Sequence, residues 1–333
     1  MPLSETGIAA KLIRQSELNY THIIPDIVIE LARNLRNVTY RETLSKFAEA
    51  YFPQEFKRLR DQFEIVLDYE SELVRNCLGE DVGIELDSAM RDDLSATAIN
   101  ETYRYHFIHA FQDFLTGVIV IDKFYDDFAR WFSGESTDST RIESAWLLAA
   151  LFHDHFKVPP PGTSQFVVQE RQLPPELLEE EYRLASATEL ASLYEHLRCG
   201  GSLRSWSRTQ IQDHPLVEIL LTQLKNKNHG AVGGLSLLTH KIPDLHIIYS
   251  AALAVALHDR VPREELLTRN IFPVQMEKFP LIALLLYCDA IQEWNRCLNS
   301  KVDLVGITFL PNEVSFVLHF SIISVKGACQ VKA

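Results

Sequence analysis

The chain has 333 residues, a hydrophobic content of 47%, a charged content of 23% and a formal net charge of −13 at pH 7. Such a length provides one large or two ordinary domains with ample capacity for a core, and the composition is typical of a soluble globular protein. The negative charge argues against general nucleic-acid binding, because the affinity of such proteins comes from Lys and Arg that neutralise phosphates.

Cysteine usage and apolar runs indicate the compartment. The five cysteines are scattered without a Cys-x-x-Cys pair, which fits a reduced protein better than a disulfide framework. Residues 1–17 have no long apolar core, so we expect no signal peptide. The longest apolar runs, around 247–257 and 281–288, are too short to span a bilayer. We therefore expect a cytoplasmic protein without a membrane partner.

The first hundred residues are predicted to be a helical scaffold. Residues 8–78 show a 3.6-residue apolar periodicity, and Gly79 is a typical helix stop. The acidic stretch 79–100 is interpreted as a solvated connector, since acidic clusters usually lie at the surface. No residue in this region suggests a catalytic or metal-binding role.

Residues 101–132 predict a strong amphipathic helix. His106 and His109 are three residues apart and share a helix face, and Asp113 follows His109 by four. A histidine among aromatic residues is more often a hydrogen-bonded core residue than a ligand. Whether these histidines are metal ligands therefore depends on whether the rest of the chain contains further ligand-type residues.

The stretch 146–157 is an apolar run that ends abruptly in ionisable residues. A helix this apolar would be buried, and His153 and Asp154 at its end then need partners or a metal ion. Histidine and aspartate are ligand types for a divalent ion. Lys157 lies one turn further, on the same side if the helix persists that far.

Residues 162–212 are polar and mixed, and we interpret them as an insertion near the pocket. They lead to the segment 226–234, whose asparagines suit a helix start and whose small residues favour close helix packing beside His229. A phosphate-binding loop is not favoured here, because the Gly-Lys-Ser/Thr of the Walker pattern is missing.

Two further apolar helices end in ionisable residues. The run 245–259 finishes with His258 and Asp259, and the run 279–289 finishes with Asp289. A buried aspartate is almost always paired, so Asp289 has either Arg296 or a metal ion as its partner, and the metal ion is the sharper explanation. Beyond residue 299 a period-two pattern over 302–320 predicts a β-hairpin.

In chain order, these residues resemble the motif of the HD-domain superfamily of metal-dependent phosphohydrolases, in its two-metal H…HD…H…H…D branch. The resemblance covers roughly residues 101–296, and Lys157 matches the frequent HD-x-x-K. It implies an all-α helical bundle over 101–298, between the scaffold of 1–100 and a small C-terminal β-hairpin in 299–333. The metal ligands that it implies are His109, His153, Asp154, His229, His258 and Asp289.

The resemblance also implies a mechanism. Asp154 would bridge two divalent ions (Fe, Mn, Zn or Mg), which activate water for hydrolysis of a phosphate ester or nucleotide. Lys157 would bind an anionic group of the small-molecule phosphorylated substrate. Asp154 and Lys157 are thus the expected catalytic residues, and a homo-oligomer is compatible with the sequence.

Several alternatives stay open. The family usually has an Arg where this chain has His106, so His106 and His109 compete as first ligand, and we prefer His109. A second register would use His229 as first ligand, the pair His258-Asp259 and then Asp289, but it leaves Lys157 unexplained. The competing functions are a di-iron, O2-dependent oxygenase similar to myo-inositol oxygenase and a catalytically silent regulatory module. A structural zinc site is disfavoured, because such sites prefer four ligands rich in Cys.

Overall fold

The computed structural model describes residues 33, 35, 38–51, 59–84, 86–87, 91, 106–133, 139–157, 173–199, 211–269, 271, 278–292, 300–310 and 313–322. The helices of this part of the chain are α3 (Val38–Tyr51), α4 (Leu59–Leu78), α6 (His106–Lys123), α7 (Tyr125–Ser133), α8 (Ser139–Phe152), the 3-10 helices η1 (His155–Lys157) and η3 (Pro175–Leu178), α9 (Glu180–Arg198), α11 (Pro215–Lys225), α12 (His229–Leu237), α13 (Leu245–His258), α14 (Arg260–Thr268) and α15 (Pro280–Gln292).

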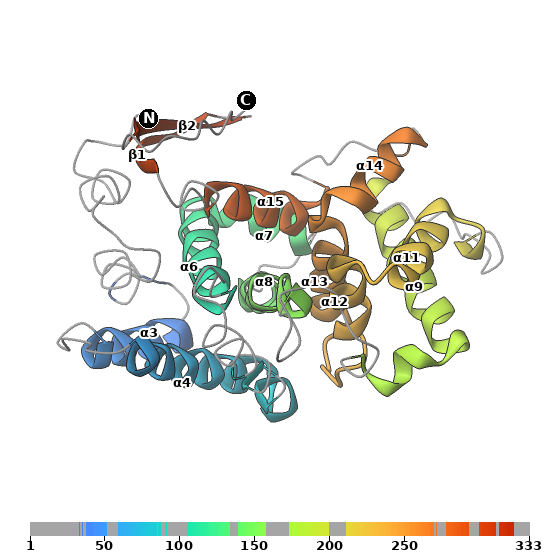
Figure 1. Cartoon of the computed structure of the whole chain (residues 1–333), viewed down its shortest axis with the longest axis horizontal. Coiled ribbons are helices and arrows are strands. Elements are labelled where there is room, and N and C mark those ends of the chain that lie inside the picture. The colour runs from blue at the N-terminus through green and yellow to red at the C-terminus, as the bar shows by residue number, and fades with distance from the viewer. Residues whose placement is uncertain are drawn as a thin grey trace.

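The predicted all-α fold is confirmed for the described part of 38–292, where the regular elements are helices (Figure 1). Helix α8 contacts α6 and α13, and α15 contacts all three. These four helices enclose the centre of the molecule, and α12 packs along α13. Residues that lie far apart in the sequence are thereby brought to one place.

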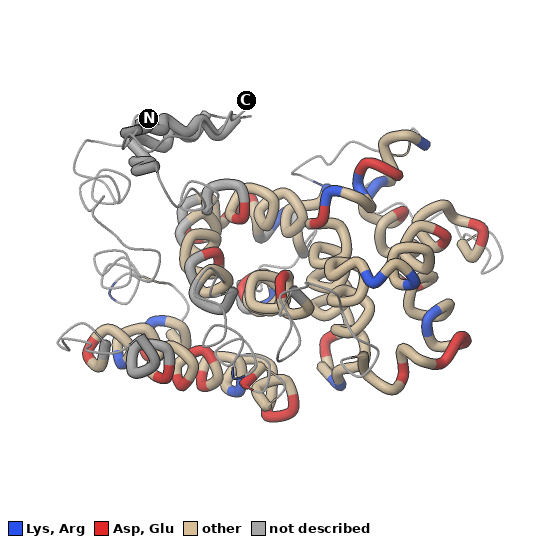
Figure 2. Tube along the Cα trace, in the orientation of Figure 1, with Lys and Arg blue, Asp and Glu red and all other residues tan. Residues whose placement is uncertain are grey.

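Helices α8 and α13 are central because a long C-terminal part of each is apolar on all sides. In α8, every residue from Ala145 to Phe152 is buried, and in α13 the same holds from Ser250 to His258. A helix without a polar face is stable only inside a protein. Charged residues lie instead on peripheral helices such as α4 and α9 (Figure 2).

Small residues bring the central helices unusually close together. A Cβ on Gly117 of α6 would lie 2.1 Å from the ring of Trp146 of α8, whose indole nitrogen donates a hydrogen bond to the Phe114 carbonyl at 3.0 Å. A Cβ on Gly234 of α12 would lie 2.5 Å from the Ala252 carbonyl oxygen of α13. The close helix packing predicted for the segment around His229 is thus confirmed.

The helices α3 and α4 pack against each other and reach the central helices through α6 and α8. One connected apolar core runs from Leu35 to Cys288, so these helices share it. Helix α9 also contributes, since Leu190, Ala191 and Tyr194 are fully buried. The division at residues 100 and 298 and the insertion at 162–212 stay predictions, and the helices expected over 8–32 lie outside the described residues.

Two local expectations are corrected. The single helix expected over 101–132 is two helices, because the backbone turns at Phe124 between α6 and α7. Helix α8 does not persist to Lys157: it ends at Phe152, and His153 and Asp154 form a turn before η1. Helical spacing therefore does not place Lys157 beside the His-Asp pair, and its side chain lies outside the described residues.

At the C-terminal end, the strands β1 (Ser300–Leu310) and β2 (Glu313–Ile322) pair antiparallel, with an irregularity between Leu304 and Gly306 (Figure 1). No side chain of these strands is described, so the expected hairpin as a packed part of the fold stays a prediction. Within the described residues, no helix is both long and apolar enough to cross a membrane.

Candidate metal centre

Two neighbouring groups of side chains have the composition of metal sites. One consists of His109, Asp113, His153 and Asp289, and the other of Asp154, His229 and His258, with the donor atoms of each group all within 4.8 Å of one another. They come from α6, from the turn after α8, from the start of α12, the end of α13 and from α15.

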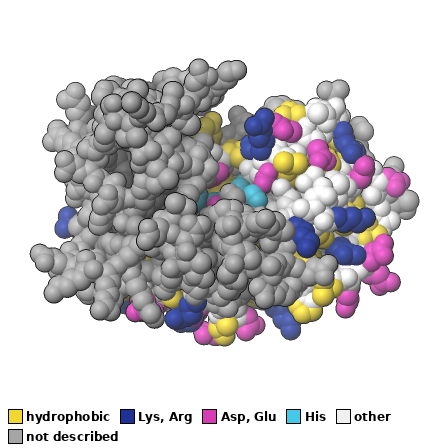
Figure 3. Space-filling model, viewed as in Figure 1, with side chains coloured by type: hydrophobic (Ala, Val, Ile, Leu, Met, Phe, Trp, Pro, Cys, Tyr) yellow, Lys and Arg dark blue, Asp and Glu magenta, His cyan; other side chains and the backbone are white. Residues whose placement is uncertain are grey.

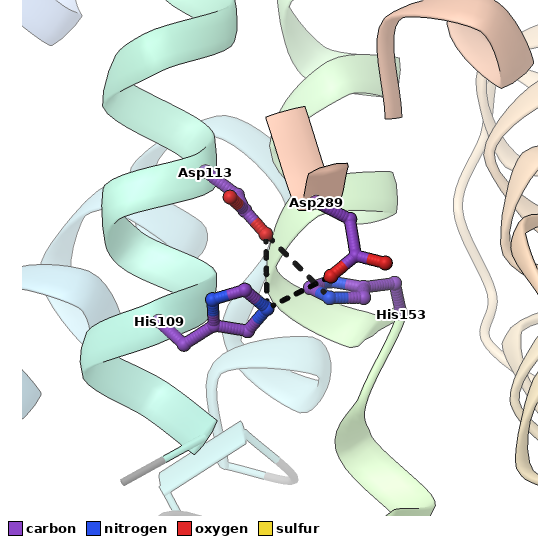
Figure 4. Close-up of side chains that lie close together, drawn as sticks. All are labelled: His109, Asp113, His153 and Asp289. Atoms are coloured by element: carbon purple, nitrogen blue, oxygen red, sulfur yellow. Dashed lines mark ion pairs between the residues drawn. The ribbon is translucent and has the colours of Figure 1, made fainter. Parts of the chain in front are cut away.

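In the first group, two carboxylates approach one imidazole nitrogen. The Nε2 atom of His109 lies 3.3 Å from Oδ2 of Asp113 and 3.3 Å from Oδ1 of Asp289. The Nε2 atom of His153 lies 3.6 Å from the same oxygen of Asp113. Figure 4 shows the four side chains pointing toward one another from α6, α15 and the end of α8.

In the second group, two imidazole nitrogens face each other. The Nε2 atoms of His229 and His258 are 3.1 Å apart. The Nδ1 atom of His258 donates to the Val255 carbonyl at 2.6 Å, and Nδ1 of His229 lies 3.2 Å from Oδ2 of Asp259. Because carbonyl and carboxylate oxygens only accept, both protons belong on Nδ1, and the two Nε2 lone pairs point at one place.

The carboxylate of Asp154 lies between the two groups. Its Oδ1 atom is 3.5 Å from Nε2 of His258, 3.7 Å from Nε2 of His229 and 3.6 Å from Nε2 of His153. Its other oxygen is 4.0 Å from Nε2 of His109. This arrangement suits a carboxylate that bridges two cations.

Burial controls the charge state of the centre. It lowers the pKa of His153 to about 3, although the charge of Asp154 acts in the opposite direction. His153 is therefore neutral near pH 7, and Nδ1 donates to the Ala150 carbonyl at 2.8 Å, which leaves Nε2 as the ligand atom. For Asp289, burial raises the pKa, but the hydrogen bond from His109 acts in the opposite direction, and the pKa is well below its usual range.

The donor atoms fit divalent ions. Neutral imidazoles that share one point repel each other through their lone pairs unless a cation lies between them. Two ligand atoms at roughly 2.0–2.2 Å from one ion stand about 3 Å apart, which is the scale of the 3.1 and 3.3 Å separations here. The mixture of imidazole and carboxylate suits Zn, Fe or Mn.

All six predicted metal ligands lie in these two groups, while two further residues were missed as participants. Asp113 belongs to the first group, and its spacing of four from His109 was the available signal. Asp259 orients His229 and also caps α14, where its Oδ1 accepts from the Val261 amide at 2.9 Å. Burial raises the pKa of Asp259, but the hydrogen bond from the Val261 amide acts in the opposite direction, and the pKa is below its usual range.

The structure bears on one of the two alternative ligand assignments and leaves the other untested. Asp259 faces the Nδ1 atom of His229 and stands outside both donor groups, whereas the register built on His258-Asp259 needs it as a ligand. The side chain of His106 lies outside the described residues, as does all of Arg296. The choice of His109 as first ligand therefore stays a prediction.

One side of the centre is open. The side chains of Asp113 and His153 are fully buried, while those of His229 and Asp289 are 18% and 23% exposed. Figure 3 shows histidine and acidic side chains in a hollow of this face of the molecule. The centre is thus accessible from the side of His229 and Asp289, with Asp113 and His153 below them.

No family model, no curated protein and no solved structure matches this chain. The protein is therefore characterised by its helical fold and its His/Asp centre alone. Together they describe a helical protein with a buried cluster that can hold metal ions.

Proposed function

We propose that the protein is a metal-dependent phosphohydrolase of the HD-domain type, which acts on a phosphate ester or nucleotide through a dinuclear centre. The observation that carries the proposal is the position of Asp154, whose two oxygens face histidines of both donor groups. The order of the ligands along the chain and their origin on separate buried helices are those of the two-metal branch.

Each residue has a role that follows from its surroundings. His109, Asp113, His153 and Asp289 would hold one ion and His229 and His258 the other, with Asp154 shared. When bound, the two ions would supply a water of lowered pKa and an electrophilic clamp for phosphoryl oxygens. The hydrogen bonds from Nδ1 of His153 and His258 to backbone carbonyls keep both rings oriented for this task. Lys157, whose side chain is not described, keeps the anion-binding role that the resemblance implies.

The proposal is tested by metal analysis and by assay of His258→Ala. Protein purified without chelator should contain about two divalent ions per chain and hydrolyse p-nitrophenyl phosphate. His258→Ala should retain about one ion and lose activity by orders of magnitude, because it removes an imidazole from the second group. Its far-ultraviolet circular dichroism should match the wild type.

A matched control is His246→Ala, which removes a half-buried histidine of α13 that belongs to neither donor group. It should keep both ions. Two equivalents of metal and full activity in His258→Ala would show that the dinuclear assignment is wrong. Stoichiometric iron together with O2 consumption would identify the oxygenase instead, and an inactive protein without metal would favour the regulatory module.

A further inference from the structure

Arg263 of α14 stands beside the open side of the metal centre. Its Nε atom donates to the Asp259 carbonyl at 3.1 Å, and the carboxylate of Asp259 contacts His229 of the second donor group. The side chain is half-buried, whereas the neighbouring Arg260 is 80% exposed and pairs with Glu264. The two arginines of one helix are therefore in different environments.

The charge of Arg263 also reaches the first donor group. Burial lowers the pKa of this guanidinium, and the charges of Asp259 and Asp289 raise it. Asp289 belongs to α15 and contacts His109, so Arg263 lies within electrostatic range of carboxylates at both ends of the centre. An arginine remains charged even in such a position.

Part of the guanidinium remains available to a ligand. The Nε atom is occupied by the Asp259 carbonyl, and among the described residues neither terminal amino group of Arg263 has a hydrogen-bond partner. The planar fork of guanidinium donors matches phosphate oxygens in geometry and charge. Half-burial strengthens such a bond because it weakens the screening by solvent.

We propose that Arg263 is a substrate-binding residue whose terminal amino groups hold a phosphoryl oxygen of the substrate at the open side of the metal centre. The inference rests on the proposed function and deepens it, because it assigns the substrate anion two kinds of contact: the metal ions below and a guanidinium at the rim. The nearest competing role is structural, in which Arg263 only fixes the Asp259 backbone.

The test is the affinity of the metal-loaded protein for inorganic phosphate, measured by calorimetry at fixed ionic strength. Arg263→Ala should weaken binding by about tenfold to a hundredfold, as expected for loss of a charge-assisted hydrogen-bond pair. Arg263→Lys keeps the charge without the fork and should lie between Arg263→Ala and wild type. Arg260→Ala, the matched control on the same helix, should bind phosphate as the wild type does.

Metal content and thermal stability, measured on the same samples, separate the roles. The proposal is supported if Arg263→Ala keeps about two ions and the wild-type melting temperature while phosphate binding weakens. It is overturned if phosphate affinity is unchanged, or if both Arg263 variants lose metal, which would make the residue structural. Wild-type protein that takes up no metal would contradict the proposed function itself, before any variant is compared.

Discussion

At the scale of single residues, Asp113 adds a fully buried carboxylate to the first donor group. The sequence motif does not include this residue. Its Oδ2 atom lies within 3.3 Å of His109 and 3.6 Å of His153, which is the ligand-to-ligand scale of one coordination sphere. A second carboxylate beside Asp289 makes this group harder and more negative than the group of His229 and His258. The two ions would therefore differ in affinity and in preferred metal.

We predict that Asp113→Asn weakens binding of the ion in the first group by about tenfold to a hundredfold, since it removes a negative charge next to two imidazoles. The affinity is measured by titrating the metal-free protein with the metal ion in a calorimeter. Asp126→Asn, an exposed change at the start of α7, is the matched control and should leave both ions bound. Unchanged affinity in Asp113→Asn would make Asp113 a structural partner of His109 only.

At the scale of helices, the approach of α12 to α13 sets the distance between His229 and His258. Their Cα atoms belong to the first residue of one helix and the last of the other. Gly230 lies one residue beyond His229, and a Cβ there would come within 3.1 Å of both the Asp259 side chain and the Val255 carbonyl oxygen. The small residues of α12 thus serve the metal centre through helix packing.

We predict that Gly234→Ala destabilises the protein by about 1–3 kcal/mol, because the added methyl overlaps the Ala252 backbone, which cannot turn away as a side chain can. Thermal unfolding should show a melting temperature lower by several degrees. Gly83→Ala is the control: its methyl meets only the flexible side chain of Arg75. It should be neutral or stabilising by up to about 1 kcal/mol. Equal effects of the two changes would contradict this account.

The helices could be predicted from the sequence because of their apolar periodicity. Most of the centre could be predicted because a His or Asp at the end of a buried apolar helix needs either a charged partner or a metal ion. The residues His153, Asp154, His258 and Asp289 were found in this way, and they do come together. Asp113 was not, since a carboxylate four residues after a histidine is also the ordinary pattern of a helical ion pair. The end of α8 at Phe152 was missed as well: no glycine or proline stands there, and the tight turn at His153 and Asp154 depends on tertiary packing.

At the scale of the whole molecule, several half-buried histidines outside the donor groups are neutral in the folded protein. Burial lowers the pKa of His155 to about 4 and also lowers the pKa of His240 and His246. In the unfolded chain each would titrate near 6.5. As the pH falls below about 6.5, the unfolded state binds more protons than the folded state, so the free energy of unfolding decreases.

We therefore predict that the metal-free protein loses stability steadily between pH 6.5 and about 4, as measured by urea unfolding at a series of pH values. Replacement of His155 with Phe removes one of these groups and should flatten the dependence, because Phe152 and Phe156 already surround this ring. A stability that is constant or rises as the pH falls through this window would show that these histidines are protonated in the fold.

The origin of the donor atoms on helices spread from α6 to α15 has a consequence for how the protein is made. Asp289 leaves the ribosome more than half a chain length after His109, so a growing chain offers only a partial set of donors. Tight capture of metal would thus require a chain that has been made at least as far as Asp289 and whose helices have packed together. An ion that binds only the finished fold stabilises it by mass action. Metal supply in the cell would then decide how much newly made protein escapes proteolysis.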